Sequence, residues 1–155
     1  MGRIWRGRAY RWGDETVKDA SLWGGAAILF AVSILHFYWA FGGRWGGRAA
    51  IPEKAAGEAV FVPRAPETAA VAVLVAFVGL LLLAQGGLLD AYTPNGFTYW
   101  SAVVCGSGFA LRAIGEFKYV GFLKRVKGTT FAKLDSWLYS PLCALLSVVF
   151  WLAIG

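Results

Sequence analysis

The side chains of this sequence that could do chemistry gather at one end of its apolar segments. Charged groups at membrane depth are costly, and they usually face a helix-bundle interior or a wet cavity. Successive spans run in opposite directions, so polar motifs that end one span and begin the next must meet on one side. We expect a one-sided binding site there, with these candidate residues: His36, Tyr38, Trp39, Arg44, Trp45, Arg112, Glu116, Tyr119, Asp135 and Tyr139.

His36 is the one histidine of the chain, and on a helix its side chain neighbours Trp39. A single imidazole is a poor metal site, and the sequence has no zinc-type spacing, so we expect no metal and no cofactor. Two roles for His36 stay open. It hydrogen-bonds or protonates a ligand, or it is a satisfied buried histidine that locks the first span to the third.

Arg112 and Glu116 stand four residues apart, so on a helix they share a face and can pair. A structural ion pair is one interpretation. The other is that the arginine fork binds a phosphate or carboxylate. Catalytic residues are unknown; if the protein is an enzyme, His36 and Glu116 are the best acid–base pair for proton-transfer or isomerase chemistry on a lipid-like substrate.

Asp135 stands at the start of the last apolar segment. It is placed to cap that helix, which is the preferred interpretation, or to pair with a base from the loop before it. Tyr139 lies one turn later on the same face and can reach inward. Tyrosine and tryptophan also populate membrane interfaces without any ligand, so Tyr38 and Trp39 have that simpler explanation too.

The composition indicates a membrane protein. The 155 residues are 58% hydrophobic and only 15% charged, whereas soluble domains have roughly a quarter charged residues. Four apolar segments, of about 20 residues each, are long enough to cross a bilayer. We expect an all-α integral membrane four-helix bundle with short loops, one domain over residues 21–155 after a basic, aromatic N-terminal arm over residues 1–20. The predicted spans are 21–41, 68–89, 97–119 and 134–154.

Glycine and proline mark the ends of these spans. Gly42 and Gly43 should end the first helix, and Pro94-Asn95-Gly96 should form a turn before the third. Pro141 predicts a kink or a late start in the fourth. The proline-rich connector 42–67 should fold back on the bundle as packed structure, with a lid as the alternative.

Basic residues set the expected orientation. Connectors 42–67 and 112–133 hold ten lysines and arginines, against five in the N-terminal arm. The positive-inside rule then places both connectors in the cytoplasm and the protein in the inner (plasma) membrane. The excess charge favours anionic lipids over nucleic acid as partner. Cys105 and Cys143 fall inside spans and are expected to be small buried apolar groups.

Several strings are long and unusual: LHFYWAFGGRWG, IPE, PET, LRAIGEFKYVGFLKRVKGTTFAKLD and LYSPLC. They resemble the uncharacterised bacterial domain-of-unknown-function family 3995, over about residues 33–145. The resemblance implies a four-span fold and an integral membrane location, and it brings no activity with it.

Three functions remain as hypotheses at this stage. The leading one is binding of an amphipathic lipid or isoprenoid-like ligand in a pocket with a polar head. The second is an accessory subunit that contacts a membrane protein partner, and the third is a small-solute transporter that acts as a homo-oligomer. A transporter fits less well, because no polar track crosses the predicted spans.

Overall fold

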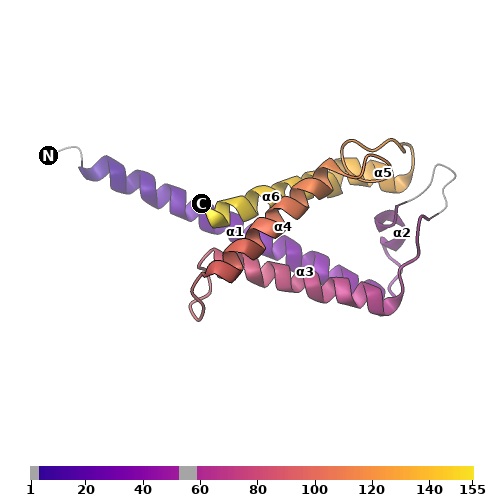
Figure 1. Ribbon diagram of the computed structural model, residues 1–155, viewed down its shortest axis with the longest axis horizontal. Helices are drawn as coiled ribbons and strands as arrows, with labels where there is room; N and C mark the ends of the chain where they lie inside the picture. The colour runs from indigo at the N-terminus through magenta and orange to yellow at the C-terminus, as the bar shows by residue number, and fades with distance from the viewer. Residues whose placement is uncertain (1–3, 53–58) are drawn as a thin grey trace.

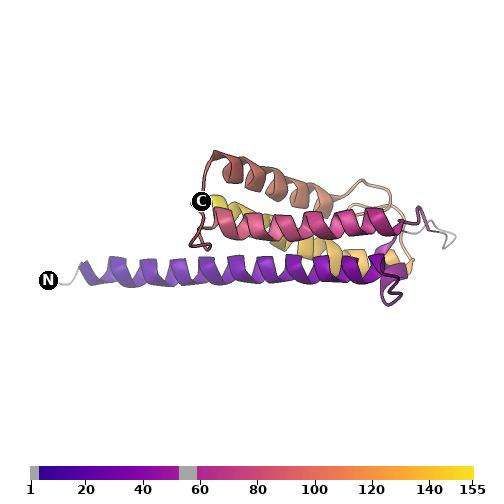
Figure 2. The same ribbon diagram turned by 90° about the horizontal axis from the view of Figure 1, so that it is seen from below.

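The fold is built from helices throughout the part of the chain that the structure describes. The computed structural model describes residues 4–52 and 59–155. Its elements, in chain order, are α1 (Ile4–Ala40), α2 (Gly47–Ala50), α3 (Ala65–Gln85), α4 (Gly96–Ile114), α5 (Thr130–Leu134), the π turn η1 (Asp135–Tyr139) and α6 (Ser140–Ile154). Figures 1 and 2 show the four long helices and the projection of α1 beyond the others at its N-terminal end.

The long helices associate as two pairs. α1 packs along α3, and α4 packs along α6. In Figure 1 the pairs meet near the C-terminus and diverge toward the end that carries α2 and α5. We call the end where the pairs meet the closed end; it holds the 86–95 connection. We call the opposite end the polar end; α1 and α4 finish there, and α3 and α5 begin there.

The apolar core lies at the closed end. All four helices contribute to it through these buried residues: Leu22, Ala26, Leu29, Leu81, Leu82, Leu83, Ala102, Leu146, Val149, Phe150 and Ala153. None of them comes from the polar end. The polar end has fewer buried apolar residues, Ala113, Phe131 and Ala132, and relies more on polar contacts.

One serine hydroxyl joins the helices of each pair. Ser33 Oγ donates to the Ala72 carbonyl oxygen at 2.7 Å, which ties α1 to α3. Ser147 Oγ donates to the Gly106 carbonyl oxygen at 2.8 Å, which ties α6 to α4. Small residues let the backbones approach this closely, and Gly106 is the small residue at this contact.

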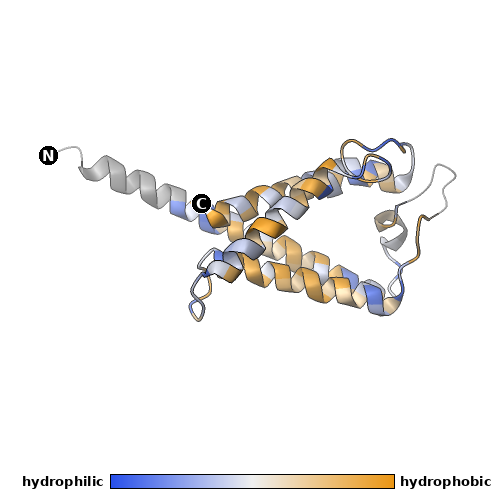
Figure 3. Cartoon of the chain, viewed as in Figure 1, coloured by the Kyte–Doolittle hydropathy of each residue, from blue (hydrophilic) through white to orange (hydrophobic). Residues whose placement is uncertain are grey.

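Three helices are long and apolar enough to cross a membrane among the residues described: Glu15–Ala40, Ala65–Gln85 and Thr130–Ile154. α4 is not among them, because its 19 residues include three glycines, several hydroxyl side chains and Arg112. Figure 3 shows the apolar character of the helices and the hydrophilic residues at their ends and in the connections.

Of the eight predicted span limits, three lie within one residue of the observed helix ends and five do not. α1 ends at Ala40 and Gly42 has φ 90°, while Asn95 caps α4 through the Phe97 and Thr98 amides. The first helix, however, begins at Ile4 rather than near 21. Residues 4–20 of the expected N-terminal arm therefore belong to the same helix as the first predicted span. α3 occupies Ala65–Gln85 rather than 68–89.

The third and fourth predicted spans also differ from the structure. α4 stops at Ile114 instead of 119, because Gly115 adopts φ 91°, a conformation that ends a helix. The last helical stretch begins at Thr130, four residues before the predicted start, because Thr129 caps it by accepting from the Ala132 amide. Pro141 follows a π turn instead of delaying the helix.

Two glycines of α4 give a matched test of the packing between α4 and α6. A Cβ on Gly106 would lie 3.2 Å from Phe150 Cβ and 3.3 Å from Trp151 Nε1, whereas a Cβ on Gly108 would meet nothing within 4 Å. We expect Gly106→Val to destabilise the protein by about 1–3 kcal/mol, since overpacking forces side chains and backbone apart. Thermal unfolding in detergent measures this, and Gly108→Val is the control. Equal unfolding midpoints for the two variants would contradict the close packing.

Candidate functional site

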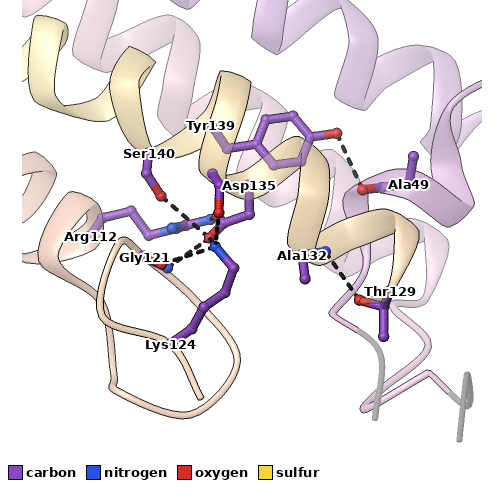
Figure 4. A network of polar contacts seen from close by, with 10 residues as sticks. Ala49, Arg112, Gly121, Lys124, Thr129, Ala132, Asp135, Tyr139 and Ser140 are labelled. Atoms are coloured by element: carbon purple, nitrogen blue, oxygen red, sulfur yellow. Dashed lines mark hydrogen bonds and ion pairs between the residues drawn. The ribbon is translucent and has the colours of Figure 1, made fainter. Parts of the chain in front are cut away.

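A buried carboxylate organises the polar end. Asp135 is fully buried, and Arg112 Nη2 donates to its Oδ1 at 2.9 Å. Its Oδ2 accepts from the Gly121 amide at 2.7 Å and from Lys124 Nζ at 3.0 Å. Figure 4 shows these groups converging on the carboxylate from α4, the 115–129 loop and the π turn. Such pairing is what makes a buried charge tolerable.

Lys124 is almost completely buried, with 2% of its side chain exposed. Its ammonium donates to three acceptors: Asp135 Oδ2 at 3.0 Å, Ser136 Oγ at 2.7 Å and the Gly121 carbonyl oxygen at 3.0 Å. A lysine ammonium has three protons to donate, so all of them are used. Lys124 therefore pins the 115–129 loop onto the start of the last helix and has nothing left for a ligand.

Arg112 is the other cation on this carboxylate, and it is only partly satisfied. About a third of its side chain, 36%, is exposed. While Nη2 bonds Asp135, Nη1 is buried and has no hydrogen-bond partner among the described residues. A guanidinium offers five N–H donors in a planar fork, so this second nitrogen is a free donor.

The π turn sets the direction of the Asp135 side chain relative to Ser140. The Ser140 amide donates to the Asp135 carbonyl oxygen, five residues back, which defines the π hydrogen bond. This widened turn brings residues 135 and 140 onto the same side, where Ser140 Oγ donates to Asp135 Oδ2 at 3.3 Å. In a regular α-helix two residues five apart would point in different directions. Pro141, which has no N–H, follows directly and leaves one fewer backbone bond to satisfy.

The loop that reaches Asp135 depends on two glycines. Gly115 and Gly121 have φ 91° and 88°. A Cβ on Gly115 would clash with Val120 O, and a Cβ on Gly121 would clash with Gly115 Cα, because the backbone passes close to itself here. Only glycine permits both this φ and this approach. The Phe122 amide then donates to the Ala113 carbonyl oxygen at 2.9 Å, so the loop folds back over the end of α4.

Tyr139 connects this network to the first connector. Its hydroxyl donates to the Ala49 carbonyl oxygen of α2 at 3.2 Å, and its ring lies 6.0 Å from that of Phe131. The expectation that the connector 42–67 folds back on the helices is therefore confirmed for α2. Val60, Phe61 and Val62 of the same connector are exposed, and residues 53–58 lie outside the described residues.

His36 lines a cavity of about 410 Å³ between α1, the connector and α3. Its Nδ1 lies 2.8 Å from the Val32 carbonyl oxygen, and because a carbonyl can only accept, Nδ1 carries the proton. Nε2 is then the nitrogen left for a ligand. Trp39 and Glu67 share this cavity, and the Trp39 ring packs edge-on to His36 at 5.1 Å.

A second cavity, of about 630 Å³ and wide open to its surroundings, lies between the connector and the end of α4. Its lining is mixed, with an apolar part and a polar part: Pro52, Val60, Phe61, Leu111, Arg112, Gly115, Glu116, Tyr119 and Val120. Phe61 lines both cavities. The expected single site is therefore divided in two, and His36 and Glu116, the expected acid–base pair, line different cavities.

The remaining candidates lie outside both cavities. Tyr38, Arg44 and Trp45 are exposed, and 76% of the Trp45 surface is accessible. Trp45 contributes its carbonyl oxygen, which accepts from Trp39 Nε1 at 2.8 Å. Tyr38 packs its ring against the turn at Gly43. These residues hold the end of α1 in shape.

Two expectations for the charged motifs were wrong. Arg112 does not pair with Glu116, because α4 ends at Ile114 and Glu116 is exposed beyond it. Asp135 is not the helix cap, which is Thr129. The alternative for Asp135, pairing with a base from the preceding loop, is confirmed by Lys124.

Sequence reasoning missed Lys124, Gly121 and Ser140. Lys124 is one of four basic residues in the loop 121–133, and nothing in their order marks the one that is buried. The spacing of Gly115 and Gly121 was the available signal, since two glycines around a short segment permit a tight reversal. Among the described residues, no three His, Cys, Asp or Glu side chains gather where they could hold a metal.

Comparison with known families matches residues 29–150 to the family described as protein of unknown function (DUF3995). The chain belongs to the DUF3995 family. The match includes α3, α4, the Asp135 network and both cavities, so the candidate site lies within the DUF3995 region. Neither the curated proteins nor the solved structures gave a match.

Asp135→Asn tests whether the buried network holds the polar end together. The change removes the negative charge and leaves Lys124 buried without a counter-ion, so we expect a loss of about 3–5 kcal/mol in the free energy of unfolding. Denaturant unfolding in detergent measures it. Glu116→Gln makes the same chemical change on an exposed residue and should lie within about 0.5 kcal/mol of wild type. A wild-type stability for Asp135→Asn would show that the network is dispensable.

Proposed function

We propose that this DUF3995 protein is a four-span integral membrane protein that binds an amphipathic, lipid- or isoprenoid-like ligand at its polar end. The observation that carries the proposal is the pair of adjoining cavities that share Phe61, one lined by His36 and the other by Arg112. Their volumes fall in the range of small-molecule sites, which is roughly 300–1,000 Å³. Each combines apolar walls with a few polar groups.

The proposed membrane location rests on the three apolar helices and on the position of α4. α4 packs along α6, so a bilayer that α6 crosses encloses α4 as well. Its exposed surface carries apolar residues, including Val104 and Leu111 at 69% and 68% accessible. Arg112 lies in its last turn, near the interface, where a cation costs least.

The proposed orientation places the polar end at the cytoplasmic face of the plasma membrane. The two connectors at this end hold ten basic residues, twice the number in the N-terminal arm. Short loops with more lysine and arginine stay in the cytoplasm. A ligand drawn from the inner leaflet would then meet the cavities directly.

The composition of the cavity walls favours an amphipathic ligand over a small polar solute. The His36 cavity is lined mainly by apolar groups, among them Ile51, Val62 and Val71. A water-soluble ligand would leave these groups without a matching surface, whereas a hydrocarbon chain would cover them at a gain of about 25 cal/mol per Å². The polar groups then fix the head of the molecule.

Phe61→Ala is the substitution that tests the proposal. The Phe61 side chain lines both cavities and is 55% exposed, so its removal should change binding without unfolding the protein. We expect the retention of a co-purified ligand to fall about tenfold, as is typical when a central aromatic contact is truncated. Native mass spectrometry with lipid extraction measures that retention.

Phe122→Ala is the matched control. Phe122 is 52% exposed and is not among the residues that line either cavity. Its variant should retain the ligand at the wild-type level. If only bulk lipids co-purify, in equal amounts with all three proteins, the proposal is wrong, and a protein partner becomes the function to pursue.

A further inference from the structure

We propose that the Arg112 cavity binds the anionic oxygen group of its ligand, a phosphate or a carboxylate, with the partly exposed Arg112 guanidinium as the principal donor. This inference rests on the proposed function and adds the chemical class of the head group. Its test is therefore chosen so that the head group can fail while amphipathic binding stands.

The first argument is the balance of charge around Asp135. Arg112 and Lys124 both pair with this one carboxylate, at 2.9 Å and 3.0 Å. Among the described residues, two cations share one anion, so one positive charge is left over, and the partly exposed Arg112 side chain carries it to the cavity. An anionic group in that cavity would be attracted to this charge.

The second argument is the supply of donors, which assigns that excess to Arg112. The Lys124 ammonium is saturated by three acceptors and buried from any ligand. Arg112 keeps Nη1 without a partner among the described residues, and its side chain lines the second cavity. A guanidinium with one nitrogen fixed and the other free presents a rigid donor, which suits an oxyanion.

The surroundings of Arg112 fit a head group at the start of a hydrocarbon chain. Gly115 and Tyr119 line the polar side of the cavity, and Leu111, Val60 and Phe61 line the apolar side. The loop beyond carries these exposed basic residues: Lys118, Arg125, Lys127 and Lys133. Basic residues beside a membrane attract anionic amphiphiles to the surface before they bind.

Among the described residues, Glu116 is the acidic one that lines the same cavity. It is exposed, and it forms no ion pair or hydrogen bond with any described residue. As a carboxylate it repels an anion, so its neutralisation should strengthen binding. That opposite sign makes Glu116→Gln a second, independent test of the same inference.

Arg112→Lys separates ligand binding from folding. A lysine at this position keeps one cationic nitrogen for Asp135, so the buried carboxylate stays paired. It removes the rest of the guanidinium fork, which the proposal assigns to the ligand. A truncation to alanine would instead take a counter-ion from Asp135 and confuse binding with stability.

The experiment measures the melting temperature in dodecyl-maltoside micelles with dodecyl phosphate, dodecanoate or dodecanol at equal mole fractions. A ligand that binds the folded state raises the melting temperature according to its affinity. We expect the two anions to raise it and dodecanol to do so less. The apparent affinity for the anions should fall about tenfold in Arg112→Lys and rise in Glu116→Gln.

The outcomes separate the two proposals and the two anions. A rise with dodecyl phosphate alone assigns a phosphate, and a rise with both anions assigns either oxyanion. Equal rises with dodecanol and the anions, unchanged in Arg112→Lys, would overturn the anionic head group and leave amphipathic binding intact. No rise with any probe would overturn both proposals.

Discussion

The polar end of this protein depends on a single buried carboxylate. Asp135 has no exposed surface, and it receives hydrogen bonds from α4, from the 115–129 loop and from Ser140 one π turn later. The main apolar cluster lies at the other end, and only a few buried apolar residues, among them Ala113, Phe131 and Ala132, lie here. Without Asp135, two cations would lie together at a helix end, and the loop would lose the bonds that the Gly121 amide and Lys124 make to the carboxylate.

This arrangement also explains how a structural network can leave a functional group free. Lys124 does the structural work, because all three of its donors are used inside the protein. Arg112 is fixed through one nitrogen, and its partly exposed side chain lines a cavity. Preorganisation of this kind lowers the entropic cost of ligand binding, since the donor is already held in place. The buried carboxylate is thus the link between the fold and the proposed site.

The sequence predicted the helices well and their polar contacts less well. Apolar length marked the long helices, and local rules marked the ends at Gly42 and Asn95, because both signals act within a few residues. The partner of Arg112 could not be found this way. The i, i+4 rule pointed to Glu116, but Gly115 ends the helix between them, and the true partner lies 23 residues away across a loop.

The division of the site into two cavities was equally out of reach. It arises from Phe61 and the α2 segment, which are placed by long-range contacts such as that between Tyr139 and Ala49.

Hydrogen exchange over residues 115–129, compared between wild type and Lys124→Met, tests the central claim most directly. We predict slow exchange of the Gly121 amide in the wild type and fast exchange throughout the loop in the variant. Fast exchange of this loop already in the wild type would contradict the account.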